Sequence, residues 1–137
     1  MENAANNFCK GLRVLLVEDE SVIAMLTENM LADLGCENIA IAGSIAQALD
    51  AIDQHPPDLA VLDVNLRGQM VLPAAEKLAA ASIPFTFATG YGASEMLAAW
   101  RSYPVIQKPF GISELERALR QALATARLAP NAPCPTS

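Results

Sequence analysis

The sequence has little positive charge and no long apolar segment. It contains 9 Lys and Arg against 15 Asp and Glu, a formal net charge of −6 over 137 residues. Nucleic-acid phosphates are bound by clustered Lys and Arg, so this balance argues against a nucleic-acid surface. No apolar run could span a bilayer, and the start of the chain has neither the basic nor the apolar region of a signal peptide. We expect a cytoplasmic protein that binds neither nucleic acid nor membrane.

Cysteine and histidine are also scarce. The three cysteines, Cys9, Cys36 and Cys134, are widely spaced and form no Cys-x-x-Cys pair. This pattern indicates neither a disulfide framework nor a zinc knuckle, so we expect ordinary thiols. The single histidine, His55, lies next to Pro56 in an expected loop, and we interpret it as a surface residue.

The composition is that of one folded domain. Hydrophobic residues make up 53% of the chain, which is ample for a core, and a second domain would not fit in this length. We expect the domain to cover residues 12–128, with flexible ends at 1–11 and 129–137.

Short apolar runs alternate with amphipathic stretches along the whole domain. The runs are 13–17, 38–42, 59–63, 85–88 and 105–107. Most are continuously apolar, which is typical of parallel strands covered by helices on both faces. The alternation predicts a mainly parallel, doubly wound α/β sheet, because right-handed crossovers place helices on both faces. Ligands bind such sheets at the carboxyl ends of the strands.

Helical periodicity fills the intervals between these runs. It predicts helices at 21–34 and 73–81 and a short helix at 94–101. Ser44 with Gln47, and Ser113 with Glu116, fit the capping box that marks a helix start. The last helix should place one apolar stripe against the domain, namely Leu115, Ala118, Leu119, Ala122, Leu123 and Ala126, and turn Arg117, Arg120 and Arg127 outward.

Charged and hydroxyl side chains follow four of the expected strands. They are Glu18 and Asp19, Asp63, Thr89, and Lys108. Three carboxylates that converge at about 4 Å repel one another by roughly 1 to 4 kcal/mol per pair, depending on the dielectric. A divalent cation would remove this repulsion, and a small set of oxygen ligands favours Mg²⁺. The sequence therefore predicts a Mg²⁺ site at this edge of the sheet.

Each of these residues alone has an ordinary structural explanation. Glu18 and Asp19 would suit a solvated strand end or a helix N-terminus, and Asp63 a turn. Thr89 would suit a glycine turn, and Lys108 an exposed surface. Their joint occurrence at successive strand ends favours the functional interpretation.

The segments LLVEDE, LAVLDVNL, FATGYG and QKPF together resemble the receiver domain of two-component response regulators. The resemblance covers residues 12–128. It implies the flavodoxin-like receiver fold, with a five-stranded parallel sheet of order 2-1-3-4-5. It also implies that Asp63 accepts a phosphoryl group from a histidine kinase or a phosphotransfer protein, as one step of phosphorelay signal transduction. Such a chain is a signalling domain rather than a metabolic enzyme.

The resemblance assigns the metal ligands residue by residue. Asp19 and Asp63 would hold Mg²⁺ together with the backbone carbonyl of Asn65. Glu18 would act mostly through bound water.

The resemblance assigns two further residues to the phosphoryl group. Thr89 would donate a hydrogen bond to it, and Lys108 would pair with it, with a cis peptide bond from Lys108 to Pro109. These residue types suit the chemistry, because a carboxylate is a competent nucleophile toward phosphorus. Phosphoryl transfer then needs mainly alignment and neutralisation of charge.

The sequence departs from common receivers at one position. Receivers usually carry Tyr or Phe three residues before the lysine, where this chain has Val105. Tyr103, two residues earlier, would point the same way if it belonged to the strand, or would lie outside the strand because it precedes Pro104.

The segment PFTFATGYG is similar to the FATGUY subgroup of receivers, which are often small stand-alone domains. Gly90 and Gly92 permit a mobile loop or, alternatively, a tight turn. We expect phosphorylation to reshape residues 89–100. The loop at 65–69 should cover the phosphoryl group, with Gly68 permitting its turn. Arg67 is either a partner contact or, by default, solvated charge.

We expect a single-domain response regulator without an effector domain, whose output is protein binding. The kinase should meet the first helix with the loops over the site. A downstream target or a second copy should meet the last two helices with the fifth strand. A degenerate, phosphorylation-independent binding module is the alternative. A haloacid-dehalogenase-type phosphohydrolase would need a second Asp where Asn65 stands, and a flavin module would need hydroxyls where Glu18 and Asp19 stand.

Overall fold

The computed structural model describes residues 8–90, 99–100 and 102–128, with side chains described as far as residue 125. A five-stranded parallel sheet of order β2-β1-β3-β6-β7 forms its centre. The strands are β1 (Arg13–Val17), β2 (Asn38–Ala42), β3 (Leu59–Asp63), β6 (Phe85–Thr89) and β7 (Val105–Gln107). The predicted order 2-1-3-4-5 is confirmed, and only β6 differs from its predicted range, ending one residue later.

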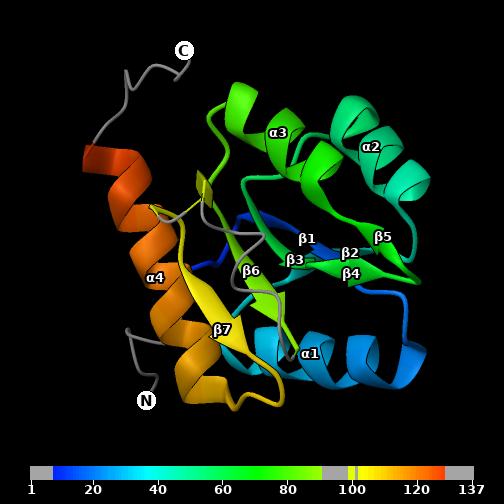
Figure 1. Ribbon diagram of the computed structural model, residues 1–137. Helices are drawn as coiled ribbons and strands as arrows, with labels where there is room; N and C mark the ends of the chain where they lie inside the picture. The colour runs from blue at the N-terminus through cyan, green and yellow to red at the C-terminus, as the bar shows by residue number, and fades with distance from the viewer. Residues whose placement is uncertain (1–7, 91–98, 101, 129–137) are drawn as a thin grey trace.

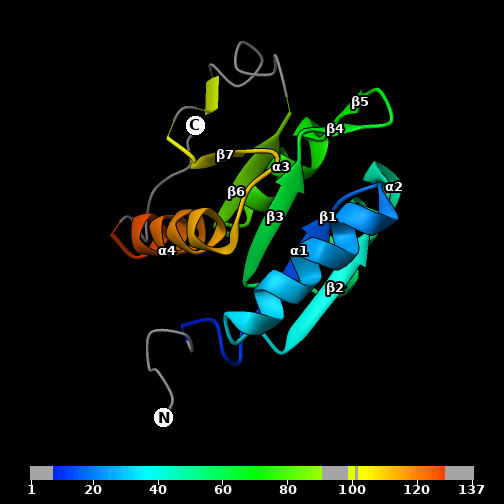
Figure 2. The same cartoon turned by 90° about the horizontal axis from the view of Figure 1, so that it is seen from below.

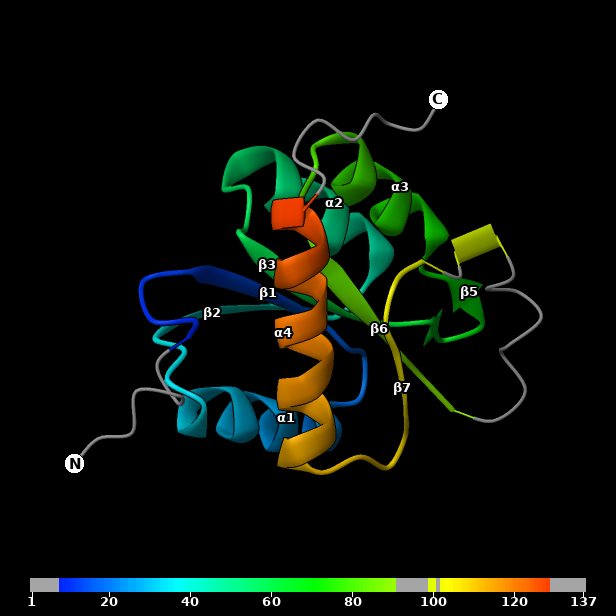
Figure 3. The same ribbon diagram turned by 90° about the vertical axis from the view of Figure 1, so that its left-hand side faces the viewer.

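Two helices cover each face of the sheet (Figure 1). On one face lie α2 (Ile45–Gln54) and α3 (Leu72–Ala80), and on the other α1 (Ser21–Asp33) and α4 (Ile112–Leu128). Figure 3 shows α4 crossing in front of the strands, and its buried residues share an apolar cluster with those of α1. The helix predicted at 94–101 and the predicted tail at 129–137 fall largely or wholly outside the described residues. Within the described ranges, none of the helices is long and apolar enough to cross a membrane.

The two faces of the sheet carry separate apolar clusters. Leu15 and Val17 pack toward α2 and α3, whereas Val14 and Leu16 pack toward α1 and α4. All five residues of β3 and all five of β6 are buried. Each fully buried Leu or Phe stabilises the fold by about 1.5 to 3 kcal/mol. Burial on both faces explains why these strands are continuously apolar until they reach Asp63 and Thr89.

One predicted helix cap is confirmed and one is wrong. The Ser44 hydroxyl accepts the Gln47 N–H at 3.1 Å, and the Gln47 side chain accepts the Gly43 N–H at 2.8 Å. At α4, however, the Gly111 N–H donates to the Glu114 carboxylate at 2.7 Å. The helix therefore begins before Ser113, and this hydroxyl lies inside the first turn instead of capping it.

The predicted loop at 65–69 is a short antiparallel hairpin. Its strands are β4 (Asn65–Leu66) and β5 (Gln69–Met70), and it projects beyond the carboxyl end of β3 (Figure 2). Arg67 (φ 52°) and Gly68 (φ 86°) form the turn between them. Positive φ at both turn residues matches the twist of a two-residue hairpin. The predicted turn role of Gly68 is confirmed.

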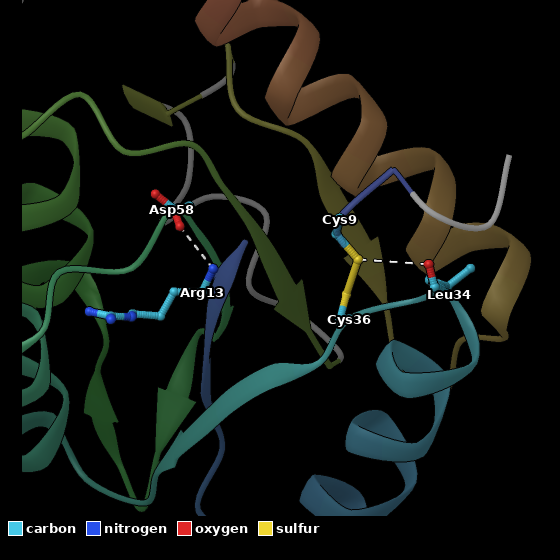
Figure 4. Close-up of a disulfide and its surroundings, with 5 residues drawn as sticks. All are labelled: Cys9, Arg13, Leu34, Cys36 and Asp58. Atoms are coloured by element: carbon cyan, nitrogen blue, oxygen red, sulfur yellow. Dashed lines mark hydrogen bonds between the residues drawn. A yellow bond between two sulfur atoms is a disulfide. The ribbon is translucent and has the colours of Figure 1, made fainter. Parts of the chain in front are cut away.

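Cys9 and Cys36 form a disulfide across 27 positions of sequence (Figure 4). The prediction of ordinary thiols is therefore wrong for this pair, and Cys134 lies outside the described residues. Both cysteines are buried, at 0% and 4% exposure, at the edge of the sheet where β1 and β2 begin. Their sequence spacing gives no signal, because only the parallel pairing of β1 and β2 brings the two segments together.

The disulfide holds part of the predicted N-terminal tail against the domain. Phe8 packs beside the α1–α4 cluster, and the Arg120 guanidinium lies 4.5 Å from the centre of its ring. Arg120 therefore also covers a ring instead of only facing solvent. The neighbouring start of β1 is tied to the start of β3, since the Arg13 N–H donates to the Asp58 carboxylate at 2.8 Å (Figure 4).

We predict that reducing the disulfide destabilises the purified protein by about 2 to 4 kcal/mol, because the cross-link restricts the unfolded chain. Urea unfolding with and without reductant measures this difference. The double variant Cys9→Ser, Cys36→Ser should unfold at the same urea concentration in both conditions. Equal stability of reduced and oxidised wild type would contradict the prediction.

Candidate functional site

Three carboxylates converge at the carboxyl ends of β1 and β3. Glu18 and Asp19 directly follow β1, and Asp63 is the last residue of β3. One oxygen of each lies within 4.8 Å of the others. Glu18 and Asp63 are each only 5% exposed. The pairing of β1 with β3 thus creates the cluster of negative charge that the sequence predicts.

Lys108 joins two of these carboxylates. Its Nζ lies 3.0 Å from Glu18 Oε1 and 3.2 Å from Asp63 Oδ1. Its backbone N–H donates to the Thr89 carbonyl at 2.8 Å, and its peptide bond to Pro109 is cis, as the family resemblance implies. The second oxygen of Glu18 accepts the Glu20 N–H at 3.2 Å. These contacts fix the positions of the Lys108 ammonium group and of the Glu18 carboxylate.

The site strongly perturbs the proton affinity of Asp63. Burial, and then the nearby charge of Glu18, raise the pKa of Asp63 from 3.8 to about 6, although Lys108 acts in the opposite direction. Burial alone would lower the pKa of Lys108, but its hydrogen bond to Glu18 and the charge of Asp63 outweigh burial and raise it. A buried carboxylate with a perturbed pKa and a fixed cationic partner is typical of functional sites.

Thr89 reaches the same edge of the sheet from β6. Its side chain is buried, and its hydroxyl donates to the carbonyl of Gly90 at 3.1 Å. In the sheet register Asp63 is paired with Ala88, so Thr89 lies one position beyond it along β6. The hydroxyl therefore contacts its own loop.

Two residues of the hairpin border the carboxylates. The Asn65 side chain accepts the Gly68 N–H at 2.7 Å, which stabilises the turn. The predicted role of its backbone carbonyl as a metal ligand stays a prediction. Arg67 forms an ion pair with Asp19, with 3.6 Å between Nε and Oδ2. The sequence alone indicates solvated charge at Arg67, because nothing in the local sequence shows that the hairpin turns it toward the site.

The carboxylates fit a small, hard cation. All three candidate ligands are oxygens, and two of them are buried, so the repulsion between them is weakly screened. Mg²⁺ binds through one or two carboxylates and keeps several waters, whereas softer metals favour nitrogen or sulfur ligands. The acidic triad is therefore a candidate Mg²⁺ site.

A family model matches this chain. The model of the response regulator receiver domain covers residues 14–120. The chain belongs to the response regulator receiver family. It is a signalling domain of two-component systems and not a metabolic enzyme, and receiver domains partner with histidine kinases.

Two curated bacterial regulators are similar to this receiver. The transcriptional regulatory protein PdtaR of Mycobacterium tuberculosis is 31% identical over 119 residues, which cover 84% of this chain and 58% of that protein. The chemotaxis protein CheY of Bacillus subtilis is 33% identical over 54 residues, which cover 39% of this chain and 45% of that protein. The chain thus spans little more than half of the length of PdtaR.

Solved structures give the same fold. SdrG from Sphingomonas melonis Fr1 matches with a TM-score of 0.73 and 41% identity, covering 81% of this chain and 95% of that chain. The receiver domain of PhyR from Erythrobacter litoralis matches with a TM-score of 0.71 and 27% identity, covering 91% of this chain and 96% of that chain.

The aromatic residue that receivers usually carry three positions before the lysine is replaced here by Val105 of β7. Val105 is 44% exposed. Tyr103 precedes β7, as expected, and stacks on Phe85 with ring centres 4.3 Å apart and planes 11° apart. Trp100 packs against the same rings, so the aromatic side chains gather over β6 and not at position 105.

The raised pKa of Asp63 predicts a pH-dependent stability. The folded protein retains a proton on Asp63 up to about pH 6, whereas the unfolded chain loses it near the ordinary pKa of 3.8. The stabilising effect of this protonation is complete below the ordinary pKa and is lost as the pH rises through about 6. Asp63→Asn should therefore stabilise the metal-free protein by about 1 to 3 kcal/mol more at about pH 7.5 than at about pH 4.5.

Urea unfolding in a chelator at the two pH values measures this effect. The exposed Asp50 on α2 offers a matched control, because Asp50→Asn removes the same charge and should shift stability equally at both values. A pH-independent effect of Asp63→Asn would show that the buried carboxyl ionises normally.

Proposed function

We propose that this receiver accepts a phosphoryl group on Asp63, in a Mg²⁺-dependent reaction, from a histidine kinase or a histidine phosphotransfer protein. The observation that carries this proposal is the buried Asp63 carboxylate, held 3.2 Å from Lys108 and beside two further carboxylates. A carboxylate nucleophile with a fixed ammonium group and a candidate metal site suits phosphoryl transfer, which needs mainly alignment and neutralisation of charge.

The proposed reaction requires little proton chemistry. An Asp63 carboxylate oxygen forms a bond to phosphorus while the bond from phosphorus to the donor imidazole nitrogen breaks, which gives an acyl phosphate. Bound at Glu18, Asp19 and Asp63, with the Asn65 carbonyl, Mg²⁺ would neutralise charge on the transferring group. Lys108 already lies at Asp63 and would pair with the phosphoryl oxygens. The Thr89 hydroxyl would exchange its bond to Gly90 for one to the phosphoryl group.

We propose further that the chain acts as a stand-alone, cytoplasmic regulator of the FATGUY type. Its similarity to SdrG over 95% of that chain and its own FATGYG segment support this assignment. The output would be protein binding, and phosphorylation would act on residues 89–100.

The apolar surface of α1 is the proposed docking site of the phosphoryl donor. Val22, Met25 and Leu26 are 68%, 59% and 54% exposed, and their spacing puts them on one stripe of the helix that starts beside Glu18 and Asp19. Contiguous exposed apolar side chains of this kind mark interaction sites. A downstream target, or a second copy in a homodimer, would bind at the sheet edge formed by β7. There a groove of about 560 Å³ lies between Val105 and Gln107 of β7 and Ala118 of α4.

A degenerate, phosphorylation-independent binding module is the second candidate, because Val105 replaces the usual aromatic residue and leaves the common switching route incomplete. The two candidates differ in whether Asp63 forms an acyl phosphate.

We predict that acetyl phosphate with Mg²⁺ adds one phosphoryl group to the wild-type protein, detected by intact mass or by phosphate-affinity gel. The adduct should be absent in chelator and in Asp63→Asn, and retained in the exposed control Asp50→Asn. Its failure to form, even with phosphorylated donor proteins, would favour the binding-only module.

We also predict that Leu26→Asp slows transfer from an autophosphorylated histidine kinase at least about tenfold, because it places a charge in an apolar contact. Labelling by acetyl phosphate should be unchanged, since the small donor needs no docking surface. Ala46→Asp, an exposed position on α2, adds the same charge on the opposite face of the sheet and should transfer normally. Equal rates for the two variants would exclude α1 as the docking site.

A further inference from the structure

Two cations divide the three carboxylates of the site between them. Lys108 contacts Glu18 and Asp63, at 3.0 and 3.2 Å, whereas Arg67 contacts Asp19, at 3.6 Å. Their surroundings differ sharply. The Lys108 side chain is 19% exposed, and that of Arg67 is 79% exposed. One cation is thus built into the site, and the other reaches it from solvent.

The hairpin places Arg67 next to Asp19 at a conformational cost. Arg67 has a φ of 52°, in the left-handed region that glycine and asparagine adopt more readily than arginine. The turn is held by the bond from the Gly68 N–H to Asn65 Oδ1 and closed by the bond from the Val71 N–H to the Val64 carbonyl at 2.8 Å. A firmly bonded turn with an unfavourable residue at its tip indicates that the arginine side chain has a use there.

We propose that Arg67 is a removable counter-ion that competes with Mg²⁺ for Asp19 and so sets the metal affinity of the site. This inference rests on the proposed function, in which Asp19 is a metal ligand. Arg67 stabilises the metal-free cluster by pairing with a partly buried carboxylate. When Mg²⁺ occupies Asp19, the guanidinium loses its partner and is repelled by the ion.

Arg67 is the cation that yields. Its exposed side chain moves into water without loss of solvation, whereas Lys108 would leave two buried carboxylates unpaired. Arg67 would therefore leave Asp19 when Mg²⁺ binds, and Lys108 would stay in place at Asp63. Arg67 is a positioning residue for Asp19, and its removal should tighten metal binding.

Mg²⁺ titration without any phosphoryl donor tests this inference. Amide chemical shifts of the labelled protein, at physiological ionic strength, report the dissociation constant for wild type, Arg67→Ala and Arg117→Ala. Arg117 is an exposed arginine on α4, so its removal changes the net charge equally, and screening at this ionic strength weakens the effect of a charge far from the site. We expect Arg67→Ala to bind Mg²⁺ about two- to fivefold more tightly than wild type, the range of an exposed ion pair, and Arg117→Ala to bind as wild type does.

Two further variants separate charge from backbone effects. Arg67→Asn removes the charge but favours the left-handed turn, and it should tighten binding as Arg67→Ala does. Arg67→Lys retains the charge and should bind as wild type does. An unchanged Val71 amide shift in the metal-free variants confirms that the hairpin is intact, because the Val71 N–H closes it on the Val64 carbonyl.

The outcomes distinguish this inference from the proposed function. If wild type binds Mg²⁺ and Arg67→Ala binds it no more tightly than Arg117→Ala does, Arg67 does not compete, while the receiver chemistry stands. Weaker binding by Arg67→Ala would likewise overturn the inference, because the arginine would then assist the metal. If neither wild type nor Arg67→Ala binds Mg²⁺, the proposed function fails together with the inference.

Discussion

The structure depends on a cluster of negative charge that is held at low exposure by one lysine. Glu18 and Asp63 are nearly buried, and Lys108, which directly follows the edge strand β7, bridges them. Such a cluster is unfavourable unless its charges are paired. The order β2-β1-β3-β6-β7 satisfies this need, because it places the ends of β1 and β3 side by side and brings β7 close enough for a long side chain to reach them.

The sequence predicts this arrangement because apolar residues give way to carboxylates directly at the expected strand ends, at Glu18 and at Asp63. β1 and β3 are continuously apolar and end directly at carboxylates, so both the strands and the edge where the acids meet are visible in the sequence. Periodicity also predicts α1 within one residue. Lys108 and Thr89 are predictable for the same reason, since each stands at the end of an apolar run. The direction of the Thr89 hydroxyl, toward Gly90, is a local hydrogen-bonding choice that no pattern reveals.

The features that the sequence did not predict all depend on contacts formed by tertiary structure or by backbone conformation. The disulfide of Cys9 and Cys36 arises because β1 and β2 start side by side, and the pairing of Arg67 with Asp19 arises from a turn with two positive φ values. Ser113 does not cap α4, because the helix begins at Ile112 and the Gly111 N–H donates to Glu114, not to the predicted Glu116 pairing of a Ser113 cap. In each case, several partners were compatible with the local sequence, and the fold selected one.

The position of the aromatic residues constrains how the site communicates with the rest of the domain. Val105 is exposed on β7, whereas Tyr103 is stacked on Phe85 of the neighbouring strand β6. The Thr86 hydroxyl also donates to the Pro104 carbonyl at 3.0 Å, which joins β6 to the segment before β7. Under the proposed function, a shift of Thr89 would move β6, which contacts Trp100 and Tyr103 through the ring of Phe85 and Pro104 through this bond. In the proposed function, such coupling would act through the backbone and an aromatic stack instead of the rotation of a single side chain, next to the groove along β7.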